Sequence, residues 1–103
     1  MTVVIKKPGK SAELAEIAHE LKAYQEIVGG YIEIVPVGPS LMMVCNEEGK
    51  LLNLPLNFVW NDDAIAGTVF FCSRDAEDIT GLTKDRAKAV KAWLDSMSKA
   101  EGV

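Results

Sequence analysis

The chain has 103 residues, of which 49% are hydrophobic and 25% charged, and its net charge is −4 at pH 7. This length and composition fit one globular domain and exclude a disordered chain, and every apolar run is shorter than the ~20 residues of a membrane helix. The acidic balance argues against direct binding of nucleic acid, which needs a basic face. Because the first residues lack the apolar core of a signal peptide, we expect a cytoplasmic protein.

The N-terminal part begins with a predicted strand over residues 2–6, where Thr, Val and Ile are concentrated. Pro8-Gly9 predicts the turn that ends this strand. Residues 11–28 follow, and their apolar residues recur at helical spacing. This spacing favours a single amphipathic helix from Leu14 to Val28.

A second interpretation divides the same stretch. Ala12–Ile17 then forms a strand, Ala18-His19 a turn, and a short helix begins near Glu20. Ala, Glu and Leu favour helix, so propensity supports the single long helix, and both interpretations stay open at this point. In either case Gly29-Gly30 predicts the end of the helix, because glycine adopts the left-handed conformation of a C-cap at no steric cost.

Two strands are predicted after these glycines. Residues 31–37 form the first, and Pro36 and Pro39 exclude a fully hydrogen-bonded central position at its end. Leu41–Cys45 forms the second, and it is apolar throughout. A short run of this kind indicates a strand that is covered on both faces.

The middle of the chain is predicted as a hairpin followed by a loop. Asn46–Gly49 has the composition of a four-residue turn with a positive φ at its glycine, so Leu41–Leu52 is interpreted as a hairpin. Leu54–Trp60 is apolar but contains Pro55. We interpret it as a loop or a short helical turn that lies across the core.

The C-terminal third contains the strongest strand signal, Thr68–Cys72, and ends in a helix. Ser73–Gly81 is interpreted as an acidic loop. Thr83 is a suitable N-cap for a helix over Lys84–Lys99, and residues 101–103 are expected to fray. The apolar positions of this helix recur at i, i+3 and i+4 and predict a buried stripe made by Ala87, Val90, Trp93, Leu94 and Met97.

No catalytic or metal-binding constellation is recognisable in the sequence. His19 is the only histidine, and no motif places a nucleophile beside it. Cys45 and Cys72 lie in apolar strand-like runs and are expected to be buried thiols. A zinc site needs about four ligands. We therefore expect no enzymatic activity, no cofactor and no metal.

The acidic residues suggest a partner-binding surface. They cluster in three predicted turns or loops, formed by Glu47 and Glu48; Asp62 and Asp63; and Asp75, Glu77 and Asp78. Such clusters are usually solvated, but if the three lay at one end of the sheet they would form an acidic patch suited to a basic groove on a partner. Trp60, next to the second cluster, is a candidate interface anchor.

Five motifs occur in order along the first three quarters of the chain: PGK (8–10), EIVGGYIE (26–33), VCNEEGKL (44–51), LPLN (54–57) and IAGTVFF (65–71). With these motifs the chain resembles a family of small uncharacterised domains carried by phages and other mobile elements of bacteria, especially gut Firmicutes. Some members resemble anti-CRISPR proteins that block type II-A Cas9, and this chain is similar to that group in length and motif content.

The resemblance implies a phage-side inhibitor that acts in the cytoplasm of the bacterial host by non-catalytic binding. Its expected partner is Cas9 or the Cas9–guide-RNA complex, with no direct contact to nucleic acid or membrane, and we expect a monomer. The alternative is an accessory protein-interaction domain of a mobile element with no CRISPR role. The resemblance also favours the strand and short helix in residues 11–28. The predicted fold is a single α+β domain over residues 1–103, with a mainly antiparallel sheet of four to six strands, a short helix before Gly29-Gly30 and a C-terminal helix packed on the sheet.

Overall fold

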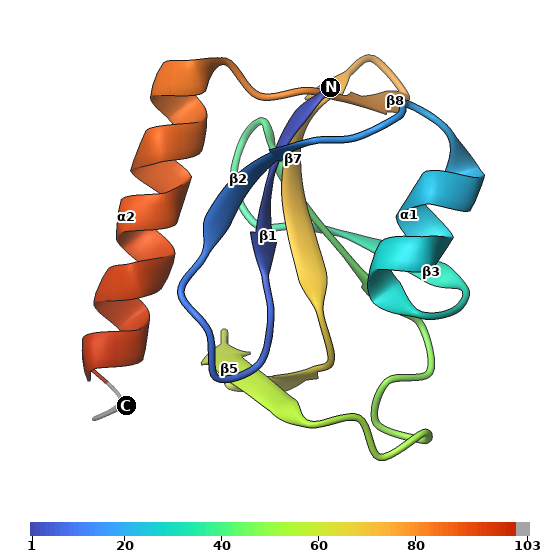
Figure 1. Cartoon of the computed structure of the whole chain (residues 1–103), viewed down its shortest axis with the longest axis vertical. Helices are drawn as coiled ribbons and strands as arrows, with labels where there is room; N and C mark the ends of the chain where they lie inside the picture. The colour runs from blue at the N-terminus through green and yellow to red at the C-terminus, as the bar shows by residue number, and fades with distance from the viewer. Residues whose placement is uncertain (101–103) are drawn as a thin grey trace.

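The protein is built around a six-stranded antiparallel sheet, seen in the computed structural model in Figure 1. The structure describes the backbone of residues 1–100 and the side chains of residues 1–97, so the expected fraying of residues 101–103 lies outside the described residues. The elements are β1 (Thr2–Lys6), β2 (Glu13–Glu16), α1 (Leu21–Val28), β3 (Ile32–Pro36), β4 (Leu41–Asn46), β5 (Leu56–Trp60), β6 (Asp63–Ala66), β7 (Val69–Asp75), β8 (Asp78–Thr80) and α2 (Lys84–Ala100). The strand order is β2-β1-β7-β4-β3, with β8 also paired to β7 and with β5 and β6 forming a separate hairpin. The predicted α+β class is confirmed.

The central strands β4 and β7 are buried on both faces of the sheet. Met43 lies opposite Phe71 and Val44 opposite Phe70, and all four side chains are fully buried. Strand β4 was predicted from its uninterrupted apolar run, which is typical of a strand covered on both faces, and β7 from its β-branched and aromatic residues. The prediction for β4 is confirmed, and β7 extends beyond its predicted end to Asp75.

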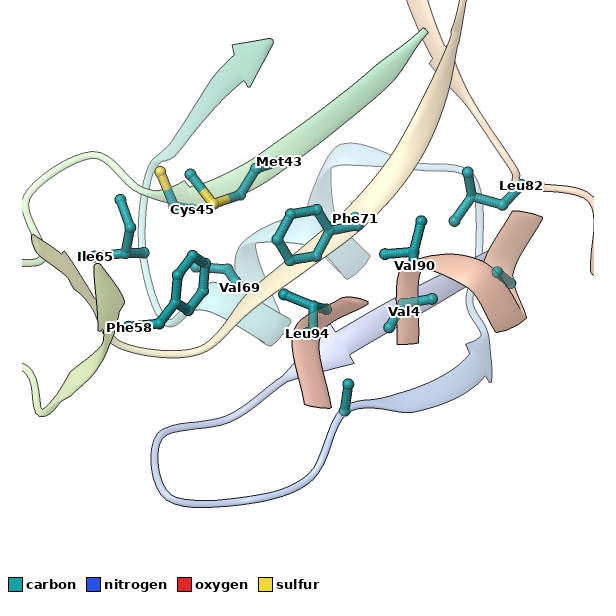
Figure 2. Packing of buried hydrophobic residues seen from close by; sticks show 12 residues of the cluster. Val4, Met43, Cys45, Phe58, Ile65, Val69, Phe71, Leu82, Val90 and Leu94 are labelled. Atoms are coloured by element: carbon teal, nitrogen blue, oxygen red, sulfur yellow. The ribbon is translucent and has the colours of Figure 1, made fainter. Parts of the chain in front are cut away.

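The C-terminal helix covers one face of the sheet. Val90 and Leu94 of α2 pack against Phe71 and Val4, and Figure 2 shows the side chains meeting between the helix and the strands. The predicted apolar stripe of α2 is confirmed, since its members belong to this core or pack against it. The β5–β6 hairpin extends the same core, into which it places Phe58 and Ile65.

The short helix α1 covers the opposite face. Its buried residues Tyr24 and Val28 pack with Phe70, Val44 and Val3 in a second core. The strand-and-short-helix interpretation of residues 11–28 is therefore confirmed, and the single long helix is wrong. Pairing of β2 with β1 overrides the helix propensity of Ala, Glu and Leu, as tertiary contacts commonly do.

Both helices have the ends that the sequence predicts. Gly29 has φ 78°, and its N–H donates to the Gln25 carbonyl at 2.8 Å, which is a left-handed C-cap. Thr83 caps α2, because its Oγ1 accepts a hydrogen bond from the Arg86 N–H at 3.2 Å.

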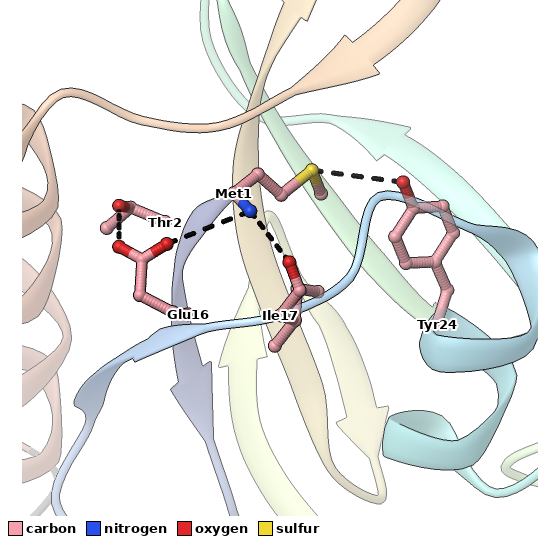
Figure 3. A network of polar contacts seen from close by, with 5 residues as sticks. All are labelled: Met1, Thr2, Glu16, Ile17 and Tyr24. Atoms are coloured by element: carbon pink, nitrogen blue, oxygen red, sulfur yellow. Dashed lines mark hydrogen bonds and ion pairs between the residues drawn. The ribbon is translucent and has the colours of Figure 1, made fainter.

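Polar contacts join the start of β1 to the segment between β2 and α1 (Figure 3). The Met1 amine donates to the Ile17 carbonyl at 2.7 Å and lies 3.7 Å from the Glu16 carboxylate. Glu16 also accepts from the Thr2 hydroxyl, and the Tyr24 hydroxyl contacts the Met1 sulfur at 3.8 Å. These contacts fix the position from which α1 begins.

The predicted hairpin Leu41–Leu52 is wrong. Strand β4 already pairs with β3 on one side and β7 on the other, so neither of its edges is open to a returning segment. Residues 47–53 instead form successive turns, in which the Leu52 N–H donates to the Glu48 carbonyl at 2.9 Å. The positive φ lies at Asn53 rather than at Gly49.

The predicted loops at Leu54–Trp60 and Ser73–Gly81 are also wrong, because each contributes to a hairpin. Asn61 and Asp62 both have positive φ, 51° and 62°, and connect β5 to β6 in a two-residue turn. Such turns match the right-handed twist of paired strands, and Asn and Asp tolerate this conformation. The second loop prediction fails because β7 continues to Asp75 and pairs with β8.

Candidate functional site

The candidate site lies where β4 ends, and buried Asn46 organises it. The Asn46 side chain donates to the Val28 carbonyl at 3.1 Å and accepts from the Glu48 N–H at 2.7 Å. One side chain therefore joins the C-terminal end of α1 to the turns that follow β4. The Glu47 N–H donates to the Tyr31 carbonyl at 2.9 Å, which fixes the same turns to the start of β3.

Gly49 anchors the turns to the β5–β6 hairpin. It is buried, and a Cβ at this position would lie 2.9 Å from the Ala66 carbonyl oxygen. Glycine is needed here for close approach of two backbones, and not for the positive φ that the sequence suggested. The ion pair between Lys50 and Asp63 adds a second connection to β6.

A cleft of about 250 Å³ opens between these turns, β3 and β6. Four carboxylates line it, those of Glu33, Glu47, Glu48 and Asp63. Lys50, also in the lining, pairs with Asp63. A cleft lined mainly by one sign of charge attracts groups of the opposite sign, here cations.

The Cys45 thiol forms part of the lining, directly opposite Glu33 across the β3–β4 pair. Burial, followed by the nearby charges of Glu33 and Asp63, raises the pKa of Cys45 to about 11. The thiol is therefore protonated at neutral pH, and a protonated thiol is a poor nucleophile. Both cysteines are free and buried, as the sequence predicts.

A second, more apolar cleft adjoins the first. It has a volume of about 450 Å³ and lies between α1 and the turns, lined by residues that include Lys22, Tyr31 and Leu52. Asn46 and Glu48 line both clefts, so the two clefts are neighbours separated by these side chains. Tyr31 is 67% exposed and Leu52 54% exposed, which leaves apolar surface beside the carboxylates.

The structure brings together only part of the predicted acidic patch. Glu47, Glu48 and Asp63 meet in the first cleft, and exposed Asp62 precedes Asp63 in the β5–β6 turn. Trp60, paired with Asp63 across the hairpin, is half-buried and packs against the core that includes Leu94 of α2.

The third acidic cluster lies elsewhere. Asp75, Glu77 and Asp78 flank the β7–β8 turn, at the opposite end of the main sheet from the Glu47 turn (Figure 1). The antiparallel pairing of β4 and β7 causes this separation, because β7 begins near the end of β4 and runs away from it. The condition for one acidic patch, that all three clusters share one end of the sheet, is therefore not met.

His19 lies beside that distant cluster. Its Nε2 donates to the Ile79 carbonyl at 2.8 Å and is 3.7 Å from Asp78. These contacts hold the connection between β2 and α1 against β8. Within residues 1–97, no group of three or more His, Cys, Asp or Glu side chains is arranged to hold a metal ion. Neither described helix has an apolar stretch long enough to cross a bilayer.

Two contributors to the site were missed in the sequence. Glu33 joins the cleft because the register of β3 and β4 sets it opposite Cys45. The only hint in the sequence was that Glu33 is a single acidic residue in an otherwise apolar predicted strand. Tyr31 was included only in the predicted strand over residues 31–37, and it is exposed just before β3.

A family model described as a domain of unknown function, DUF3846, matches residues 1–95, so the chain belongs to this family. The match includes most of α2, beyond the last of the five motifs. Neither the curated proteins nor the solved structures contain a significant match to the chain.

Proposed function

We propose that this DUF3846 member is a non-catalytic protein-binding domain that engages a basic surface of its partner through the carboxylate-lined cleft. The observation that supports this proposal is the convergence of Glu33, Glu47, Glu48 and Asp63 on one cleft from three separate parts of the chain. Opposite charges across an interface steer association and select the partner.

Exposed apolar residues beside the cleft favour a protein as the ligand. Leu51, which also lines the cleft, is 80% exposed, and Leu52 and Tyr31 continue this surface into the second cleft. Contiguous exposed apolar surface next to polar groups is typical of protein interaction sites. A basic partner surface with an apolar centre would match both features.

The resemblance of the sequence makes type II-A Cas9 the first partner to test. Such an effector holds its RNA–DNA heteroduplex in a positively charged channel and reads its recognition sequence with arginines. A small domain with an acidic end competes for surfaces of this kind. In this proposal the protein comes from a phage or mobile element and acts in the host cytoplasm, as a monomer on Cas9 or its guide-RNA complex.

A Cas9 cleavage assay with matched charge variants tests this function. One triple variant reverses the charge at three of the four cleft carboxylates: Glu47→Lys, Glu48→Lys and Asp63→Lys. The control makes the same change in net charge at the other end of the sheet: Asp75→Lys, Glu77→Lys and Asp78→Lys. We expect at least about tenfold weaker inhibition from the first variant and a change of less than about twofold from the second. Circular dichroism checks that both variants are folded.

Two results contradict different parts of the proposal. Undiminished cleavage at a large molar excess of the wild-type protein, over several Cas9 orthologues, removes the CRISPR role and leaves an accessory interaction domain with another partner. Equal inhibition by the two triple variants removes the cleft as the binding surface, whatever the partner is.

A further inference from the structure

The outer edge of β3 offers hydrogen-bonding groups in a defined pattern. The Val37 N–H donates to the Leu41 carbonyl, and the Glu47 N–H donates to the Tyr31 carbonyl, both at 2.9 Å. In an antiparallel pair, bonded and non-bonded residues alternate along each strand. The odd-numbered residues of β3 therefore bond to β4, and the N–H and C=O groups of Ile32 and Ile34 point away from the sheet.

Strand β3 is also the last strand on its side of the sheet. Ile34 is 45% exposed, so the edge has an apolar side chain at its centre. Pro36 then limits the edge, because proline has no N–H to donate. At the other side of the sheet, Asp95 of α2 accepts the Ala12 N–H just before β2, so the helix covers the start of that edge.

The edge and the cleft are continuous through Glu33. Its carboxylate lines the cleft, and its neighbours in β3 are the two isoleucines whose backbone groups point outward. A strand added to β3 would place a side chain opposite Glu33, within reach of the Glu47 and Glu48 carboxylates. Opposite charges across paired strands stabilise the pairing.

We propose, building on the proposed function, that β3 receives an extended basic segment of the partner protein as an additional strand. Backbone hydrogen bonds to Ile32 and Ile34 would hold the segment, an apolar residue would cover Ile34, and a lysine or arginine would enter the cleft beside Glu33. This is the strand-addition mode of peptide recognition. A second copy of the chain fits less well, because each copy has a net charge of −4 and would repel the other.

Hydrogen exchange with a synthetic peptide tests the added strand. The probe is a capped peptide of alternating lysine and valine, and the protein is labelled with ¹⁵N. In the free protein, the Ile34 amide should exchange faster than the Glu33 and Val35 amides, because these two bond to β4. With saturating peptide, exchange at Ile34 should slow by about tenfold or more.

Two controls separate backbone pairing from charge. The same peptide methylated at its backbone nitrogens keeps its charge but cannot pair, and it should leave Ile34 exchange unchanged. Ile34→Pro removes the outward donor, whereas Ile34→Ala removes the side chain and keeps the donor. We expect the proline variant to bind the peptide about fivefold more weakly than the alanine variant.

Failure of this inference is distinguishable from failure of the proposed function. Peptide binding that is weakened by cleft charge reversal but leaves Ile34 exchange unchanged overturns strand addition and keeps the acidic cleft. Absence of peptide binding at about millimolar concentration overturns strand addition alone, if cleft reversal still weakens inhibition of Cas9. Slower exchange at Ile34 with rising protein concentration, without peptide, shows that a second copy occupies the edge and also overturns the proposal.

Discussion

The central strands and the segment between them use apolar residues in opposite ways. In β4 and β7 these residues fill two cores, with Met43 and Phe71 on one face and Val44 and Phe70 on the other. In residues 47–66, the apolar side chains of Leu51, Leu52, Leu56 and Val59 are exposed. Phe58 and Ile65 anchor the β5–β6 hairpin in the first core, whereas the turns at residues 47–53 are held by specific contacts such as those of Asn46 and Gly49. Stability is therefore concentrated in the sheet centre, while the turns and the outer side of the hairpin retain surface for a partner.

The test with the largest expected effect truncates one side chain in each of the two regions. Phe71→Ala removes a fully buried ring that packs against Phe58 and Trp93, and it should lower the free energy of unfolding by about 3–5 kcal/mol. Leu51→Ala removes a side chain that is largely in water, and it should change the same quantity by less than about 0.5 kcal/mol. Urea denaturation measures both. Similar losses from the two variants would show that the turns at residues 47–53 also contribute to the core.

A second test concerns the anchor of the segment. Gly49→Ala places a Cβ 2.9 Å from the Ala66 carbonyl oxygen, so one of the two backbones must shift, and we expect a loss of about 1–3 kcal/mol. The matched control is Gly38→Ala, whose Cβ would be 3.5 Å from the Leu41 Cβ, an ordinary contact. Urea denaturation should show no loss for the control. If Gly49→Ala is equally stable, the turns are not fixed against β6.

The same contrast explains how much of the fold the sequence could predict. Local patterns were sufficient for β1, β4, the first part of β7 and α2, because each combines an apolar run or stripe with residues that favour the observed element. The hairpin at Leu41–Leu52 failed for a non-local reason, since β3 and β7 occupy both edges of β4. Likewise, pairing with β1 decided that residues 13–16 form a strand. Such partner choices leave no trace in local periodicity.

The site was predictable to a similar degree. Glu47 and Asp63 were identified as acids in turns, but their meeting depends on the contact between Gly49 and Ala66. Glu33 was missed because its position depends on strand register. Asp78 and its neighbours were considered for one acidic patch with Glu47 because all are acids in predicted turns or loops. The direction of β7 instead places them at the other end of the sheet.

The smallest expected effect compares the two buried thiols at alkaline pH. Burial raises the pKa of Cys72 to about 12, whereas an unfolded cysteine has a pKa of about 8.5. Below the pKa of the unfolded cysteine, the thiol is protonated in both the folded and the unfolded state, so it has no effect on the pH dependence of stability. Above it the unfolded state loses its proton first, and stability falls by about 1.4 kcal/mol per pH unit until the folded pKa is reached.

The measurement is the stability difference between wild type and Cys72→Ala at neutral pH and at about pH 9.5. The cavity left by alanine costs the same at both pH values, so a smaller difference at high pH isolates ionisation of the thiol. Cys45→Ala gives the matched comparison at the cleft, where the pKa of about 11 also lies above the test range. An equal decrease in the stability difference for both thiols means that Cys45 is as inaccessible to water as the sheet centre. A decrease for Cys72 alone would mean that water enters the cleft as far as Cys45, and that the cleft is open to a partner's side chain at that depth.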